Sequence, residues 1–147
     1  MDDLLNTIAA AQSNAAKMRH KAATVRKIAA ALDGVYITRR IVPRIEALFP
    51  DAIRVYYGIH DYGKSTRYAV IRFEDSDVNV TLATQDAPRL SRAALEETAR
   101  YYDDKAANIL RCCETYTADM NALDAVSAYI SALQRRVEVV HEAARAR

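Results

Sequence analysis

Residues 52–83, AIRVYYGIHDYGKSTRYAVIRFEDSDVNVTLA, decide the fold because the period of their apolar residues changes from about 3.6 to 2. Apolar and polar side chains alternate in three stretches: AIRVYYGIH, STRYAVIRF and DVNVTLA. Gly58, Asp61 and Gly63 indicate a first turn, and residues 75–77 indicate a second. Because both connections are short, the pattern predicts an antiparallel meander of three strands.

The residues that most often end helices are confined to the middle of the chain. All three glycines and all three prolines lie between positions 34 and 88. The flanks, which contain neither residue type and are rich in alanine, are therefore predicted to be helical. We expect an α+β fold in one domain, with these parts: a helix at 1–33, a central insert at 34–88 that holds the strands, a candidate fourth strand at 35–38 and a short helix at 45–49, and a long helical region at 89–147.

Both flanks carry a heptad pattern, in which apolar residues recur at alternating spacings of three and four. In the N-terminal flank the pattern ends at Asp33 and Gly34, which suit a helix stop. Its positions are Leu4, Ile8, Ala11, Ala15, Met18, Ala22, Val25, Ile28 and Leu32. The C-terminal positions are Leu95, Thr98, Tyr102, Ala106, Ile109, Cys113, Tyr116, Met120, Leu123, Ser127, Ile130, Leu133, Val137, Val140 and Ala144.

The C-terminal flank is too long for a compact domain if it forms one helix, because it would reach about 85 Å at 1.5 Å per residue. Thr115 and Thr117 could cap a second helix, so we expect one long helix with at most a kink or a short hairpin near Thr117. Such amphipathic helices need a partner, and an intrachain bundle is one alternative. We expect a homo-oligomer that associates through Leu123, Ile130, Leu133, Val137 and Val140.

Composition excludes several classes of protein. The chain has 147 residues and a net charge of only +2, which does not support a polybasic protein. Its two adjacent cysteines, Cys112 and Cys113, form neither a disulfide framework nor a zinc site. The start Met1-Asp2-Asp3 lacks the positive region of a secretory signal, and no apolar run approaches 18 residues. We therefore expect a cytoplasmic protein with no membrane partner.

No catalytic signature is present, so we expect no enzymatic activity, no cofactor and no metal. The three histidines, His20, His60 and His141, lie in separate segments and lack neighbours at ligand spacing. The acidic run at 74–77 lacks the spacing and the glycine of an EF-hand, and a solvated turn is its simpler interpretation.

The strongest functional signal is a basic and aromatic surface on the central insert. Residues 35–73 hold seven Lys and Arg against three acids, a charge of +4, and five of the nine tyrosines. Cations follow phosphates while rings stack on unpaired bases, so this combination favours single-stranded DNA, or RNA, as a partner. A soluble strand face of the same composition is the plainer alternative. The candidate binding residues are Arg54, Tyr56, Tyr62, Lys64, Arg67, Tyr68 and Arg72.

A second basic run on the N-terminal helix could extend a phosphate track, although such runs are usually solvated faces. Its members are Lys17, Arg19, His20, Lys21, Arg26 and Lys27.

An alanine-rich heptad helix, a Tyr/Arg strand insert (RVYYGIHDYGKSTRYAVIRF) and a long C-terminal heptad helix follow one another along the chain. In this organisation the sequence resembles the small single-stranded-DNA-binding cofactors of RNA polymerase that tailed bacteriophages encode. The resemblance implies a homo-oligomer that coats or bridges single-stranded DNA in the host cytoplasm and assists viral transcription, with RNA polymerase as a further partner. The alternative is a coiled-coil interaction or inhibitor protein that uses the same Tyr/Arg surface on another protein.

Overall fold

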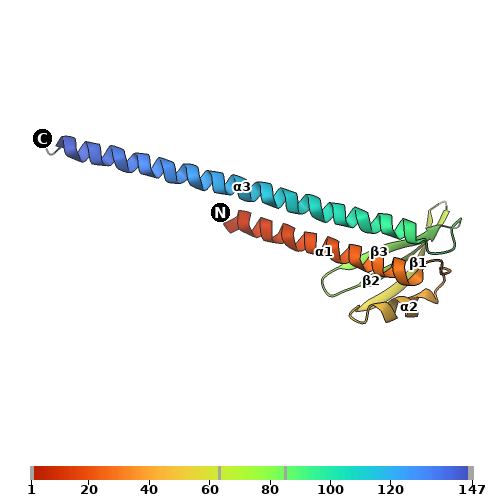
Figure 1. The fold of residues 1–147 in the computed structure, drawn as a ribbon. Helices are drawn as coiled ribbons and strands as arrows, with labels where there is room; N and C mark the ends of the chain where they lie inside the picture. Colours follow the sequence, from red (N-terminus) through yellow and green to blue (C-terminus); the bar gives the residue numbers. More distant parts are fainter. Residues whose placement is uncertain (1, 63, 85, 146–147) are drawn as a thin grey trace.

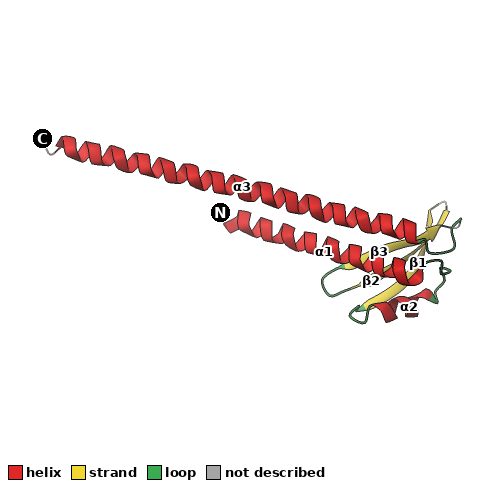
Figure 2. Cartoon of the chain, in the orientation of Figure 1, coloured by secondary structure: helices red, strands yellow, loops and turns green. Residues whose placement is uncertain are grey.

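The computed structural model describes residues 2–62, 64–84 and 86–145, with the backbone alone at positions 2, 62, 64 and 84. Two long helices run side by side from a small sheet, and one of them continues well past the other (Figure 1). Helices and strands are separated in this α+β arrangement, as the sequence predicts (Figure 2). The elements are α1 (Asp2–Leu32), α2 (Ile41–Leu48), β1 (Arg54–Tyr62), β2 (Lys64–Arg72), β3 (Asp77–Thr84) and α3 (Arg92–Arg145).

Helices α1 and α3 are antiparallel and pack along their heptad positions. Ala15 and Ala22 of α1 and Ala99 and Ala106 of α3 are fully or almost fully buried. Alanine at these positions lets the two backbones approach closely, but each contact buries little apolar surface. The predicted helix stop is confirmed, because α1 ends at Leu32 and Gly34 has a positive φ of 74°.

The sheet is an antiparallel meander of order β1-β2-β3. Its register pairs Tyr56 with Val70 and Val70 with Asn79. Between Arg67 and Tyr68 the pairing with β3 shifts by one residue, and this bulge allows Leu82 and its neighbour both to be buried.

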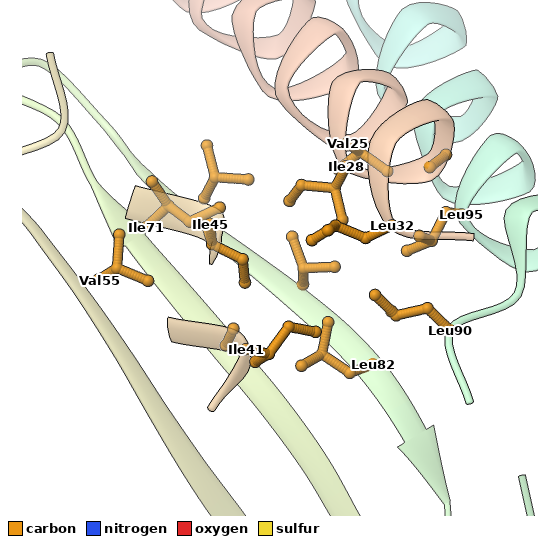
Figure 3. Packing of buried hydrophobic residues seen from close by; sticks show 14 of the residues in the cluster. Val25, Ile28, Leu32, Ile41, Ile45, Val55, Ile71, Leu82, Leu90 and Leu95 are labelled. Carbon is orange, nitrogen blue, oxygen red and sulfur yellow. The ribbon is translucent and has the colours of Figure 1, made fainter. Parts of the chain in front are cut away.

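One hydrophobic core joins all six elements on one face of the sheet (Figure 3). The inner faces of the strands contribute alternate residues, as predicted from the period of 2. Its largest fully buried side chains are Ile28, Ile37, Ile41, Ile45, Ile71, Leu90, Val25, Val78 and Val80.

Two residues that the alternation predicts to be buried are exposed. Ile53 is 65% exposed because it precedes β1, and Ile59 is 51% exposed because it lies near the hairpin end, away from the core. Tyr57 packs against the core and Tyr56 is exposed, which confirms the predicted register of β1.

The predicted fourth strand at 35–38 is wrong. Tyr36 forms an isolated bridge with Arg89 instead, and the amides of Gly34 and Ile37 donate to the carbonyls of Leu90 and Pro88 at 2.9 Å. This segment therefore pairs with the chain leading into α3 and stays outside the three-stranded sheet.

Two further features differ from the predictions: the start of the short helix and the position of the first turn. The short helix begins at Ile41, earlier than predicted, because Pro43 is tolerated in a first helical turn. Gly58 and Asp61 lie inside β1, where they form no turn, and Gly63 lies outside the described residues.

Helix α3 runs without interruption through Thr117, so the alternative of a hairpin there is wrong. The hydroxyl of Thr115 donates to the carbonyl of Arg111, and that of Thr117 donates to the carbonyl of Cys113. Both threonines thus bond back to the preceding turn of the same helix and cap no new one. The N-terminus of α3 is capped, since the amide of Arg92 donates to Asp33 Oδ1 at 2.9 Å.

Candidate nucleic-acid interface

The sheet has an outer face, turned away from the core, that is largely exposed. Because side chains alternate along a strand, the residues between the buried ones project together on this face. Val70 is the exception, because it lies on the outer face but is only 6% exposed. Neighbouring side chains of the outer face therefore cover it. The outer face consists of Arg54, Tyr56, Gly58 and His60 of β1, Thr66, Tyr68, Val70 and Arg72 of β2, and Asp77, Asn79 and Thr81 of β3.

The ring of Tyr68 lies directly over Gly58, its cross-strand partner. A Cβ atom at position 58 would collide with the hydroxyl and ring atoms of Tyr68. Glycine inside a strand often marks such a close approach, so the sequence did carry a signal for this contact. The absence of a side chain at Gly58 therefore lets the ring of Tyr68 pack directly against the backbone.

The imidazole of His60 stacks on Tyr68, with ring centroids 4.5 Å apart and an angle of 20° between the planes. His60 itself is exposed. It is absent from the candidate residues that the sequence suggests, because a lone histidine carries no motif. In the structure it extends the aromatic surface that Tyr68 begins.

Tyr56 lies on β1, as His60 does, and is 37% exposed. The guanidinium of Arg54 lies 5.1 Å from the centroid of its ring, within cation–π range. Arg54 thus places a positive charge over the ring of a partly exposed tyrosine.

Arg72 lies opposite Arg54 across β1 and β2, and its Nε atom is 3.6 Å from Asp77 Oδ1 on the third strand. The side chains of Arg72 and Asp77 are about 60% exposed, so this ion pair is weak.

Arg67 is the candidate residue that the structure removes from this face. Its Nη1 atom donates to the backbone carbonyl of Ile37, a fully buried residue on the core side of the sheet. Arg67 has the same strand parity as Ala69 and Ile71, and this parity already placed it on the inner face. The side chains of Tyr62 and Lys64 lie outside the described residues.

Four of the six residues of the basic run on α1 contact other side chains of the chain. Arg26 pairs with Asp103 at 2.5 Å and with Glu96 at 3.7 Å, both on α3. The ammonium groups of Lys21 and Lys27 lie 5.8 Å and 5.3 Å from the ring centroids of Tyr102 and Phe49, respectively. His20 meets the ring of Phe73 edge to face.

A cleft of about 620 Å³ separates α1 from the turn between β2 and β3. Lys17 and His20 line one side, and Asp51, Glu74 and Asp75 line the other. Within the described part of the chain no three His, Cys, Asp or Glu residues are placed to hold a metal ion. The acidic turn therefore offers no metal site among these residues.

The two cysteines diverge as adjacent helical residues must. Cys113 is buried between α1 and α3, whereas Cys112 is exposed. About three turns earlier on α3, burial raises the pKa of Tyr102 above its usual 10.0, and the charge of Tyr101 adds to the shift.

Among the described residues, no helix combines the length and the apolar composition needed to cross a bilayer. Comparisons of the chain with models of protein families, with curated proteins and with solved structures give no match. The candidate interface is therefore defined by its own geometry: an open sheet face on which Tyr56, Tyr68 and His60 present rings beside Arg54 and Arg72.

Proposed function

We propose that the protein binds single-stranded DNA through the outer face of its sheet. The observation that carries the proposal is the grouping of three rings with two arginines on a face that no helix covers. Neighbouring strands lie about 4.8 Å apart and alternate residues about 6.8 Å apart, so these groups fall within a few nucleotides of one another. Unpaired bases stack on the rings of Tyr56 and His60, while Arg54 and Arg72 contact phosphates.

Single strands suit this face better than a duplex does. A duplex hides the flat surfaces of its bases within the stack, and reading it requires a helix or a ribbon that enters a groove. Among the described residues, the outer face is a sheet from which no helix projects. A role beside RNA polymerase stays a prediction of the resemblance in sequence organisation.

Fluorescence anisotropy with labelled single-stranded DNA, duplex DNA and RNA tests the proposal. Tyr56→Ala should lose roughly 1 to 3 kcal/mol of binding free energy with an unchanged salt dependence, because stacking releases no counterions. Arg54→Ala should reduce the slope of log K against log salt by about 0.7, because one phosphate contact is lost.

Tyr36→Ala is the matched control. Tyr36 is also an exposed tyrosine with an arginine, Arg89, 4.3 Å from its ring centroid, but it lies outside the sheet. Its replacement should leave the affinity unchanged, and circular dichroism should show that all variants remain folded. Equal binding of duplex and single strands, or an equal loss in Tyr36→Ala, would contradict the proposal. Tighter binding of RNA would reassign the ligand.

A further inference from the structure

Among the described residues, no other element covers the last part of α3. The cavity of about 340 Å³ that Ile8 of α1 shares with Tyr116 of α3 lies close to where α1 begins. Beyond it, α3 continues alone (Figure 1). Every residue from 121 to 145, here called the tail, is exposed. Most of the stability of helices in proteins comes from packing of an apolar face, and the tail makes no such contact among the described residues.

The tail carries a continuous apolar stripe. Its members are 40% to 68% exposed and follow one another at spacings of three, four, three, four and three residues, the pattern of a coiled-coil seam. A solvated helix face has no reason to keep this spacing. The stripe consists of Leu123, Val126, Ile130, Leu133, Val137 and Val140.

Only one of the two rows of the stripe, that of Leu123, Ile130 and Val137, continues the surface that packs against α1. Steps of seven residues from the buried Cys113 lead to Met120, Ser127 and Gln134, so one of the two rows facing α1 becomes polar in the tail. The second row of the stripe lies one heptad position before this polar row. The centre of the apolar surface is therefore rotated by about 50° around the helix, relative to the surface that faces α1. A partner other than α1 must therefore cover the stripe.

We infer that the tail pairs with the tail of a second copy of this chain in antiparallel orientation. In one register all six stripe residues meet aliphatic partners: Leu123 faces Val140 of the second copy, Val126 faces Val137, and Ile130 faces Leu133. The twofold symmetry of such a pair repeats each contact. Asp119 and Ala144 then lie at the two ends of the seam, where the apolar stripe stops.

The distribution of charge favours the antiparallel orientation. Residues 114–124 contain three acids and no base, whereas residues 135–145 contain three arginines and two acids. Antiparallel pairing brings these oppositely charged ends together, whereas parallel pairing would place acids beside acids. In the antiparallel register Arg136 flanks the exposed ring of Tyr129 of the second copy, a geometry that allows cation–π contact.

The buried area suits a stable dimer. Full burial of the six stripe residues removes about 100 Å² each, so two copies bury roughly 1,200 Å², where specific interfaces begin. Alanines beside the stripe add to this area. The resulting dimer is a rod with about 120 Å between the two α3 N-termini, and it holds one sheet at each end. This arrangement does not depend on what the sheets bind.

Light scattering at micromolar concentration tests the association. The parent chain should give twice the monomer mass of 16.4 kDa, and Ile130→Asp should halve the measured mass. Ala128→Asp, on the opposite side of the tail, is the matched control and should remain dimeric. Because the tail is exposed in the single chain, neither change disturbs the core. A monomeric parent, or an equal effect of the two substitutions, overturns the inference.

Cysteine cross-linking tests the orientation. In a Cys112→Ser, Cys113→Ala background, Val126→Cys mixed with Val137→Cys should form a disulfide upon oxidation, whereas neither variant should do so alone. In the antiparallel register two copies of residue 126 are about 16 Å apart, beyond the reach of a disulfide. Efficient cross-linking of either variant with itself would overturn the antiparallel register, and circular dichroism would verify that the background folds.

Discussion

The contact between the ring of Tyr68 and the backbone of Gly58 predicts how substitutions at these two positions change the free energy of unfolding. Gly58 does not have a positive φ, so alanine at this position meets no backbone strain, and the nearest atoms that its Cβ would meet belong to the ring and hydroxyl of Tyr68. Forcing an extra methyl group into a packed contact costs about 1 to 3 kcal/mol. Removing a glycine from a strand returns about 0.4 to 1 kcal/mol through the unfolded state. Gly58→Ala should therefore lose about 1 kcal/mol of unfolding free energy.

A double-mutant cycle separates these two effects. In a Tyr68→Ala background the added methyl group meets no ring, so Gly58→Ala should stabilise the protein by about 0.4 to 1 kcal/mol. The coupling between the two positions should then exceed about 1 kcal/mol. Urea unfolding followed by circular dichroism measures all four variants. If Gly58→Ala has the same effect in both backgrounds, the ring does not lie on the glycine and the reasoning fails.

Two further predictions concern residues away from the outer face. Arg67→Met should lower the unfolding free energy, measured in urea, by about 1 kcal/mol, because the Ile37 carbonyl loses its hydrogen-bond donor. The affinity for single-stranded DNA should stay unchanged. A variant of full stability that loses affinity would contradict the position of Arg67 on the inner face. The raised pKa of Tyr102 means that the folded chain holds this proton more tightly than the unfolded chain does. Stability should thus be unaffected below about pH 10 and fall as the pH rises through the folded pKa, and Tyr102→Phe should reduce this alkaline loss in urea midpoints.

The sequence by itself determined the two long helices, the three strands between them and their order. Clustering of glycine and proline between 34 and 88 left two helical flanks, and the period of 2 in residues 52–83 identified the strands and their buried side. The parity that exposes Tyr56 and turns Tyr57 toward the core was predictable for the same reason. These features follow from local preferences and periodicity, which short stretches of chain carry within themselves.

Only the tertiary structure decided which polar and aromatic side chains are engaged in contacts within the chain and which are exposed for binding. The sequence shows no partner for Arg26, but in the structure α3 brings Asp103 into contact with it, from 77 positions further along the chain. The segment at 35–38 has strand-like composition, but its partner is the approach to α3 and not the sheet.

Stacking of His60 on Tyr68 depends on the register of a hairpin, and the free length of the tail depends on where α1 begins beside α3. Each of these contacts joins residues that no local pattern relates. They exist because packing one core fixes distant segments in a single arrangement, and that arrangement assigns each exposed side chain its neighbours.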